Sequence, residues 1–276
     1  MTSYLRDALV VGSVVAICAG LVGYFLVSRA QVFTADSFGH VAFTGALGAL
    51  VAGLDPFLGI LIATFAVGGI LALLAERGRH ADDVTIGSTF AWILGVGAFF
   101  ASIYTTNRSA EHNGRAGITY LFGSIFSITS QQVRWVVVLG AIAVIGVVVI
   151  GRPLLFASID PAVAAARGVP VRVLDGVLLA LLAVVTTVAA PTVGSLLLLG
   201  LLAAPAGAAY LLTVRPLYGL LLSPALALAA TWFGLLLVEW VPRLPPSFAI
   251  LAVATAEFVA TFLAHRFGRR PLRGVR

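Results

Sequence analysis

The chain has 276 residues, of which 61% are hydrophobic and only 10% are charged, and its mean hydropathy is +1.09. Soluble domains carry about 25% charged residues, so this composition excludes a soluble globular protein and predicts an all-α polytopic membrane helical bundle. All 17 basic residues are Arg, whereas a nucleotide-binding P-loop needs a Lys, so we expect any ATP hydrolysis to occur on a separate chain. The net charge of +6 does not indicate nucleic-acid binding, because the Arg residues gather at the ends of apolar runs.

A window of about twenty residues, the length that crosses a bilayer as a helix, predicts nine apolar segments. These segments run over 7–28, 34–53, 56–75, 84–103, 133–151, 172–190, 192–213, 217–238 and 247–265. Eight or nine of them are expected to span, because Gly and Pro could interrupt the second and the seventh. No stretch between them is long enough for a soluble domain, so we expect a single transmembrane domain over 1–276.

The Arg residues indicate how this domain is oriented. With nine spans, most Arg-bearing connections fall on one side, which the positive-inside rule assigns to the cytoplasm. That side receives Arg29, Arg77, Arg79, Arg152, Arg167, Arg172, Arg215 and a basic tail over about 266–276. The N-terminus and the 104–132 connection are then expected outside. The exceptions to the bias are Arg108, Arg115, Arg134 and Arg243.

Asp36 and His40 lie four residues apart in the second apolar segment. This spacing places both side chains on one helical face, with Cβ atoms about 5–6 Å apart. An Asp at the centre of a spanning helix costs roughly 2.5–3.5 kcal/mol, so it normally faces a bundle interior or an aqueous path. An oxygen and a nitrogen donor suit zinc, manganese or ferrous iron, whereas cuprous copper favours sulfur. The pair therefore predicts a metal site, with a structural hydrogen bond or an interfacial Asp as the alternatives.

The connection over about 158–172 has the signals of a short helix. Asp160 can cap it, Pro161 suits its first position, and Gly168 followed by Pro170 ends it. The flanking Arg residues place it in the cytoplasm, where a rigid helix can transmit the closure of a separate ATPase. The candidate coupling residues are Asp160, Pro161, Ala164, Arg167 and Gly168. An ordinary interfacial helix between two spans is the alternative.

Three other polar groups carry weaker signals. Glu257 lies midway along the last apolar segment, where we expect a packing or hydrogen-bonding role more than a transport role. Glu111 and His112 lie in the 104–132 connection, where we expect them to be a solvated pair.

Taken in order, several motifs resemble one family. They are Arg29 followed by Asp36-x-x-x-His40, Asp83 with Ile86-Gly87, Tyr120-Leu-Phe-Gly-Ser-Ile125, Asp160-Pro161 with Ala165, Gly168, Pro170 and Asp175, and Pro205 within Leu-Leu-Ala-Ala-Pro-Ala-Gly-Ala-Ala. Together they cover about 29–265 and resemble the ABC-3 permeases, the membrane subunits of bacterial ABC importers for zinc, manganese or iron(II). Where that family typically reads Asp-Ala-x-Ser-His-Ala, this chain reads Asp-Ser-Phe-Gly-His-Val and retains both presumed ligands.

The resemblance implies a transport subunit in the bacterial plasma membrane and not an enzyme. It implies a permease homodimer, two cytoplasmic ABC ATPase subunits and an extracytoplasmic metal-binding protein that delivers the ion. Zn²⁺ or Mn²⁺ would be the cargo, with no permanently bound cofactor. Two other functions remain as alternatives: an ABC permease for a siderophore or vitamin B12, and an ion-coupled secondary carrier. The latter is expected to show inverted repeats, and we detect none.

Overall fold

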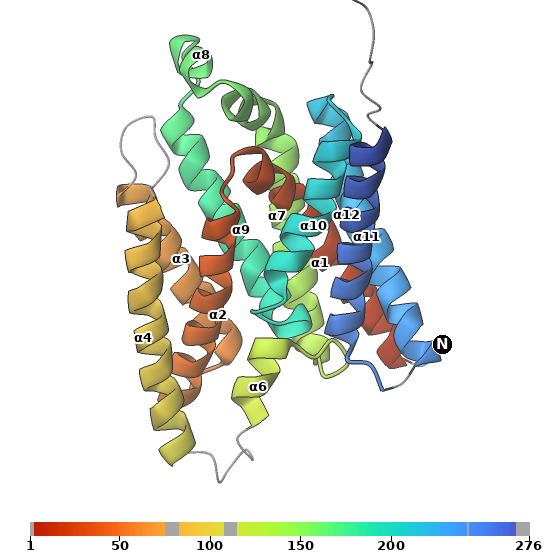
Figure 1. The fold of residues 1–276 in the computed structure, drawn as a ribbon. Coiled ribbons are helices and arrows are strands. Elements are labelled where there is room, and N and C mark those ends of the chain that lie inside the picture. Colours follow the sequence, from red (N-terminus) through yellow and green to blue (C-terminus); the bar gives the residue numbers. More distant parts are fainter. Residues whose placement is uncertain (1–2, 75–82, 108–114, 242, 269–276) are drawn as a thin grey trace, which may run out of the picture.

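The structure is a computed structural model that describes residues 3–74, 83–107, 115–241 and 243–268. The described part is built from helices, without a strand (Figure 1). The helices are α1 (Ser3–Ser28), α2 (Val32–Ala52), α3 (Pro56–Leu74), α4 (Asp83–Asn107), α6 (Arg115–Phe122), α7 (Ser130–Ile159), α8 (Pro161–Ala166), α9 (Val171–Val193), α10 (Leu198–Leu212), α11 (Pro216–Trp240) and α12 (Pro246–Gly268). The predicted all-α membrane bundle is confirmed.

Each of the nine predicted apolar segments corresponds to a helix, and α6 and α8 are additional short helices. Within the described residues, seven helices are long and apolar enough to cross a membrane, namely α1, α3, α4, α7, α9, α11 and α12. The other two are α2, whose polar residues include Asp36 and His40, and α10, whose 15 residues rise only about 22 Å. The expected number of eight or nine spans is therefore approximate.

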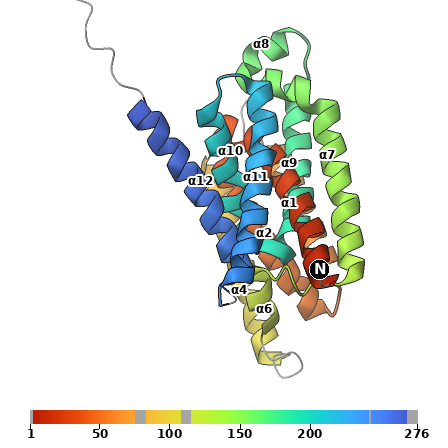
Figure 2. The ribbon, with the colours of Figure 1, turned by 90° about the vertical axis from the view of Figure 1, so that its right-hand side faces the viewer.

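The helices alternate in direction between two ends, which we call the α8 end and the α6 end (Figure 1). The chain begins at the α6 end, and α12 finishes at the α8 end. In the perpendicular view of Figure 2, α8 lies beyond the ends of the neighbouring long helices. The described chain thus starts and finishes on opposite sides, as an odd number of crossings requires.

The seventh predicted segment differs from the structure at its start. It was expected over 192–213, but α9 continues through Pro191 to Val193, and α10 begins only at Leu198. A four-residue break over 194–197 separates them, and we call it the α9–α10 break. We also expected that Gly and Pro could interrupt the second segment, but the corresponding helix α2 is continuous.

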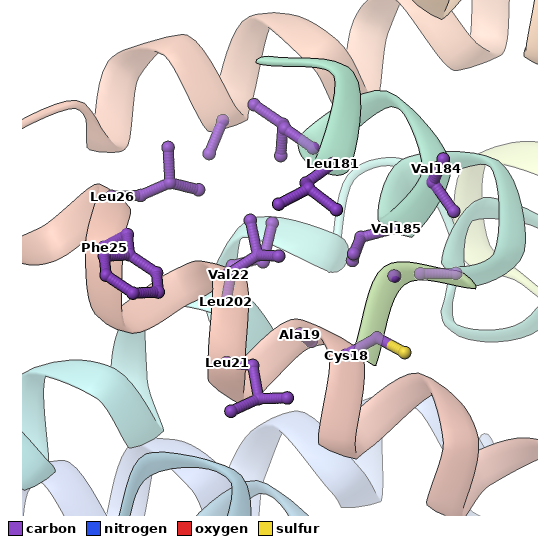
Figure 3. Packing of buried hydrophobic residues seen from close by; sticks show 14 of the residues in the cluster. Cys18, Ala19, Leu21, Val22, Phe25, Leu26, Leu181, Val184, Val185 and Leu202 are labelled. Carbon is purple, nitrogen blue, oxygen red and sulfur yellow. The ribbon is translucent and has the colours of Figure 1, made fainter. Parts of the chain in front are cut away.

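Helix α1 lies at the centre of the main hydrophobic core. Figure 3 shows Phe25 and Leu26 of α1 in one cluster with Val185 of α9 and Leu202 of α10. Helix α11 approaches α1 closely, because a Cβ atom at Gly20 would overlap the backbone of Pro224. This packing holds α1, α9, α10 and α11 together, and α2 packs beside α9 and α10.

Candidate functional site

Asp36 and His40 lie on the continuous helix α2, so the predicted sharing of one helical face holds. Both residues are half-buried. Neither side chain makes a hydrogen bond or an ion pair with any residue that the structure describes. The structural hydrogen bond between them, which would explain the pair without an ion, is therefore not present. Their donor atoms are available to a ligand.

The His40 imidazole is positioned by an aromatic contact from α4. Its ring lies 4.9 Å from the ring of Phe90, centroid to centroid, at an interplanar angle of 76°. Phe33 contacts the same Phe90 ring at 5.9 Å. One turn beyond His40, Thr44 Oγ1 donates a hydrogen bond of 3.2 Å to the carbonyl of Ile93. These contacts fix α4 against the face of α2 that carries the pair.

No cluster of three or more His, Cys, Asp or Glu side chains occurs among the residues covered by the structure. An ion held by Asp36 and His40 would need further donors from water, backbone carbonyls, hydroxyl groups or another chain. Such an incomplete shell suits an ion in transit, because conduction requires binding that is weak enough to release.

The end of α6 and the residues after it are hydrogen-bonded to the end of α9 and the α9–α10 break. Ser195 donates its backbone N–H to the carbonyl of Tyr120 at 3.0 Å, and Leu196 donates to Leu121 at 3.2 Å. In the other direction, Ser124 donates to the carbonyl of Pro191 at 3.1 Å. The sequence placed residues 120–125 in an outer connection, and it did not indicate that Tyr120, Leu121 and Ser124 are hydrogen-bonded to the end of α9 and the α9–α10 break.

Two glycines with left-handed backbone conformations make this contact possible. Gly123 has φ +72° and Gly194 has φ +98°. A Cβ atom on either residue would overlap the backbone beside the other. The pairing of Gly123 and Gly194 was not anticipated, although Gly and Pro were expected to be able to interrupt the segment over 192–213.

The α9–α10 break also packs directly on α2, beside the Asp36–His40 pair. A Cβ atom built on Gly39 would lie 2.5 Å from the carbonyl oxygen of Ser195. The Ser195 hydroxyl is buried and has no hydrogen-bond partner among the described residues. Sequence reasoning did not identify Ser195 as a functional residue.

Tyr120 lies over the small residues that join α2, α3 and α9. Its ring packs against the cluster of Ala42, Ala46, Ile60 and Ala190. Burial, assisted by the carboxylate of Asp55 and by Tyr104, raises the pKa of the Tyr120 phenol to about 12. The phenol is therefore neutral at physiological pH and does not add a charge to this region.

At the other end, α8 has the capped form that the sequence predicts. Asp160 Oδ1 accepts a hydrogen bond of 2.9 Å from the Val163 N–H, and Pro161 is the first helical residue. The helix is closed by Gly168 at φ +81°, with Val169 donating to the carbonyl of Ala164 at 3.0 Å. This 6→1 bond is the signature of a Schellman motif. The prediction of a short capped helix is confirmed.

The predicted coupling residues do not all face the same way. Pro161, Arg167 and Gly168 are exposed, and Asp160 is half-buried. Ala164 is fully buried and packs toward the bundle. A partner protein could therefore contact the exposed residues of α8 directly, whereas Ala164 would anchor the helix to its own chain.

Arg29 differs from the expectation of a charge placed in a cytoplasmic connection. Its guanidinium is buried, pairs with Asp175 of α9 and donates from Nε to Ser158 Oγ of α7 at 2.7 Å. Nη2 donates to the carbonyl of Leu154 at 3.4 Å. Burial is tolerated because each donor group has a partner, and the result is a junction of α1, α7 and α9 at the α8 end.

The remaining predicted groups contribute less. Glu257 is half-buried and its Oε2 has no hydrogen-bond partner, so the expected hydrogen bond is not formed by that atom. Other candidates lie outside the described residues, namely Arg77, Arg79, Arg108, Glu111, His112 and residues 269–276 of the basic tail.

Comparison with known proteins relates the whole chain to transport proteins. The family model described as "ABC 3 transport family" matches residues 1–265. The chain is 26% identical over 261 residues to "Manganese import system permease protein ScaB" of Streptococcus parasanguinis, covering 95% of this chain and 91% of that protein. It is 29% identical over 269 residues to "Manganese transport system membrane protein MntC" of Listeria monocytogenes, covering 95% and 90%.

Solved structures agree on the fold. A chain of "PsaBC from Streptococcus pneumoniae in complex with Fab" superposes with a TM-score of 0.79 at 25% identity, covering 95% of this chain and 92% of that chain. A putative metal-chelate type ABC transporter in an inward-facing conformation gives a TM-score of 0.64 at 13% identity, covering 94% and 85%. The second likeness is one of fold alone.

Proposed function

The chain belongs to the ABC 3 transport family, and we propose that it is the membrane-spanning permease subunit of an importer for divalent transition-metal ions, with manganese as its cargo. The curated relatives that support manganese match this chain over about nine-tenths of their own length. The chain is a multi-pass membrane protein and a transport subunit without an ATPase motif of its own.

The observation that carries the proposal is the free pair of Asp36 and His40 on α2. A half-buried carboxylate that has no partner among the residues the structure describes is costly in an apolar bundle, and a passing divalent cation would offset that cost. Carboxylate oxygen suits manganese, and imidazole nitrogen is accepted by manganese, zinc and iron. A larger organic ligand such as a siderophore would not need this pair.

The proposal includes partners on both sides of the membrane. An ABC ATPase would bind the exposed surface of α8 at the α8 end, which we assign to the cytoplasm of a bacterial plasma membrane. An extracytoplasmic metal-binding protein would deliver the ion at the α6 end. A second copy of the permease would complete the pathway and could supply further donors to the ion.

The test is metal accumulation in bacteria that lack their own manganese and zinc importers and express the complete transporter. We expect manganese to accumulate under chelator limitation only when this chain and an active ATPase are both present. Zinc accumulation that depends on the chain, without manganese accumulation, would overturn the assigned cargo. Accumulation of neither metal would overturn the proposed function.

A further inference from the structure

We propose that Ser195, in the α9–α10 break, supplies a third donor to the ion as it passes Asp36 and His40. This inference rests on the proposed function and adds a residue to the same site. The donor is the Ser195 hydroxyl oxygen, and the ligand is a hard divalent cation such as Mn²⁺.

The first step is the position of the break beside the pair. The site of a Cβ atom on Gly39 lies 2.5 Å from the Ser195 carbonyl oxygen, so the Ser195 backbone touches α2 at this residue. Gly39 is the neighbour of His40 and lies three residues after Asp36. Positions three apart on a helix have Cβ atoms about 5–6 Å apart, so the Ser195 backbone lies beside the face of α2 that carries Asp36, one residue from His40.

The approach depends on the missing side chain at residue 39. Any other residue there would press its Cβ into the backbone of the break, and that backbone is held by its own hydrogen bonds. Gly39 thus allows the break to lie against α2 at the residue that follows Asp36 by three positions and precedes His40 by one.

The second step is the state of the Ser195 hydroxyl. The residue is 6% exposed, and Oγ has no hydrogen-bond partner in the described part of the chain. Two other buried serines are satisfied: Ser223 Oγ donates to the carbonyl of Gly20 at 2.6 Å, and Ser37 Oγ donates to the carbonyl of Phe33 at 3.0 Å. A buried hydroxyl without a partner is disfavoured, and a transient ligand offers a reason for its retention.

Tyr104 and Thr186 also have unpartnered hydroxyl groups, but they lie within the regular helices α4 and α9. Of the three, Ser195 is the one that lies in a break packed on α2. Its position separates it from the other two.

The third step is the rigidity of the break. The N–H groups of Ser195 and Leu196 are bound by the carbonyls of Tyr120 and Leu121, and Ser124 binds back to Pro191. Irregular backbone at membrane depth is tolerated where it is buried in protein or lines an aqueous cavity. Interrupted helices that are held in this way form ion sites in other transporters. The contacts with 120–124 therefore hold Ser195 in place.

The resulting donor set has one carboxylate oxygen, one imidazole nitrogen and one hydroxyl oxygen. Two oxygens of three favour manganese over softer ions, and water can fill the remaining positions. A neutral hydroxyl binds a cation weakly, so it can discriminate between ions without trapping one.

The test uses the complete transporter, with its ATPase and binding protein, in proteoliposomes. In Ser195→Ala we expect manganese uptake to fall about tenfold, the scale of changes next to metal ligands, with normal protein yield and basal ATP hydrolysis. Ser195→Cys replaces oxygen by sulfur at similar size. We expect it to shift the ratio of cadmium to manganese uptake upward by about tenfold, since thiolates favour soft ions.

Ser223→Ala is the matched control, because it removes a buried serine hydroxyl from α11, where that hydroxyl binds α1, and it should leave uptake and selectivity unchanged. Normal uptake in Ser195→Ala together with an unchanged ion ratio in Ser195→Cys would overturn the inference. If Ser195→Ala fails to fold, the ratio of cadmium to manganese uptake in Ser195→Cys tests the inference by itself, and an unchanged ratio overturns it. Asp36→Asn and His40→Ala distinguish the Ser195 inference from the proposed function. If both are inactive while the Ser195 variants are normal, only the role of Ser195 is rejected, whereas near-normal uptake by both rejects the proposed site itself.

Discussion

Arg29 and Asp175 form a buried ion pair that joins the end of α1 to the first turns of α9 across 146 positions of sequence. The same guanidinium reaches Ser158 of α7, two residues before the Asp160 cap of α8. The residue after Arg29, Ala30, has φ +55°, and α2 begins at Val32. Arg29 therefore connects the end of α7, which leads into α8, to the start of the helix that carries Asp36 and His40.

We expect Arg29→Gln to destabilise the protein strongly. The substitution removes the positive partner of the Asp175 carboxylate and the donor to Ser158, and breaking a buried ion pair costs about 3 kcal/mol or more. Thermal unfolding of the purified protein in detergent measures the effect. Arg152→Gln is the control, because Arg152 is exposed at the same end. Equal melting temperatures for the two variants would contradict the structural role of the pair.

We expect Gly168→Ala to impair coupling while the protein still inserts. Gly168 has φ +81° with open space around its Cα, so the cost is conformational, about 1 kcal/mol, and the end of α8 should shift. Gly151→Ala is the control, because Gly151 also has open space but lies within α7. The measurement is ATP hydrolysis stimulated by the metal-loaded binding protein. Equal stimulation in both variants would show that the closure of α8 is irrelevant to coupling.

Single cysteines on α8 test both its orientation and its contacts. In a Cys18→Ser background, we expect Val163→Cys to react with a membrane-impermeant maleimide from the cytoplasmic side and to crosslink to the ATPase. Ala164→Cys should react slowly, because Val163 is 44% exposed and Ala164 is 0% exposed. Labelling of Val163→Cys from the outside would reverse the assigned topology.

We expect Gly123→Ala and Gly194→Ala to separate residues 120–124 from the α9–α10 break. Each new Cβ would overlap backbone that cannot move aside easily, and each residue has a left-handed φ. Manganese uptake should fall in both variants, together with the melting temperature. Gly95→Ala in α4 is the control, since nothing lies within 4 Å of its Cβ site. Uptake equal to that of the control would contradict a functional role for this contact.

Local signals predicted the parts of the structure that depend on neighbours in sequence. The Asp160 cap, Pro161 and the left-handed Gly168 could be read directly, because a short helix is determined by its own ends. The shared face of Asp36 and His40 follows from helical geometry in the same way.

Contacts between distant segments could not be predicted in this way. The pairing of Arg29 with Asp175, and that of residues 120–124 with the α9–α10 break, depend on how the helices pack. Segment boundaries show the same limit: the sixth segment was expected to end at 190 and the seventh to begin at 192, but α9 continues through Pro191 to Val193. Hydropathy and helix propensity contain no term for such contacts, so Ser195 was found only from the fold.

The central claim is that Asp36 and His40 act together on the transported ion, and manganese uptake by Asp36→Asn and His40→Ala tests it most directly. Asp36→Asn keeps the volume of the side chain but removes the charge that offsets dehydration of a divalent cation. Asp7→Asn is the control, because it removes an exposed carboxylate from α1. We predict that both site variants insert normally and lose uptake while Asp7→Asn transports as the unmodified protein does. Near-normal uptake by both Asp36→Asn and His40→Ala would contradict the account.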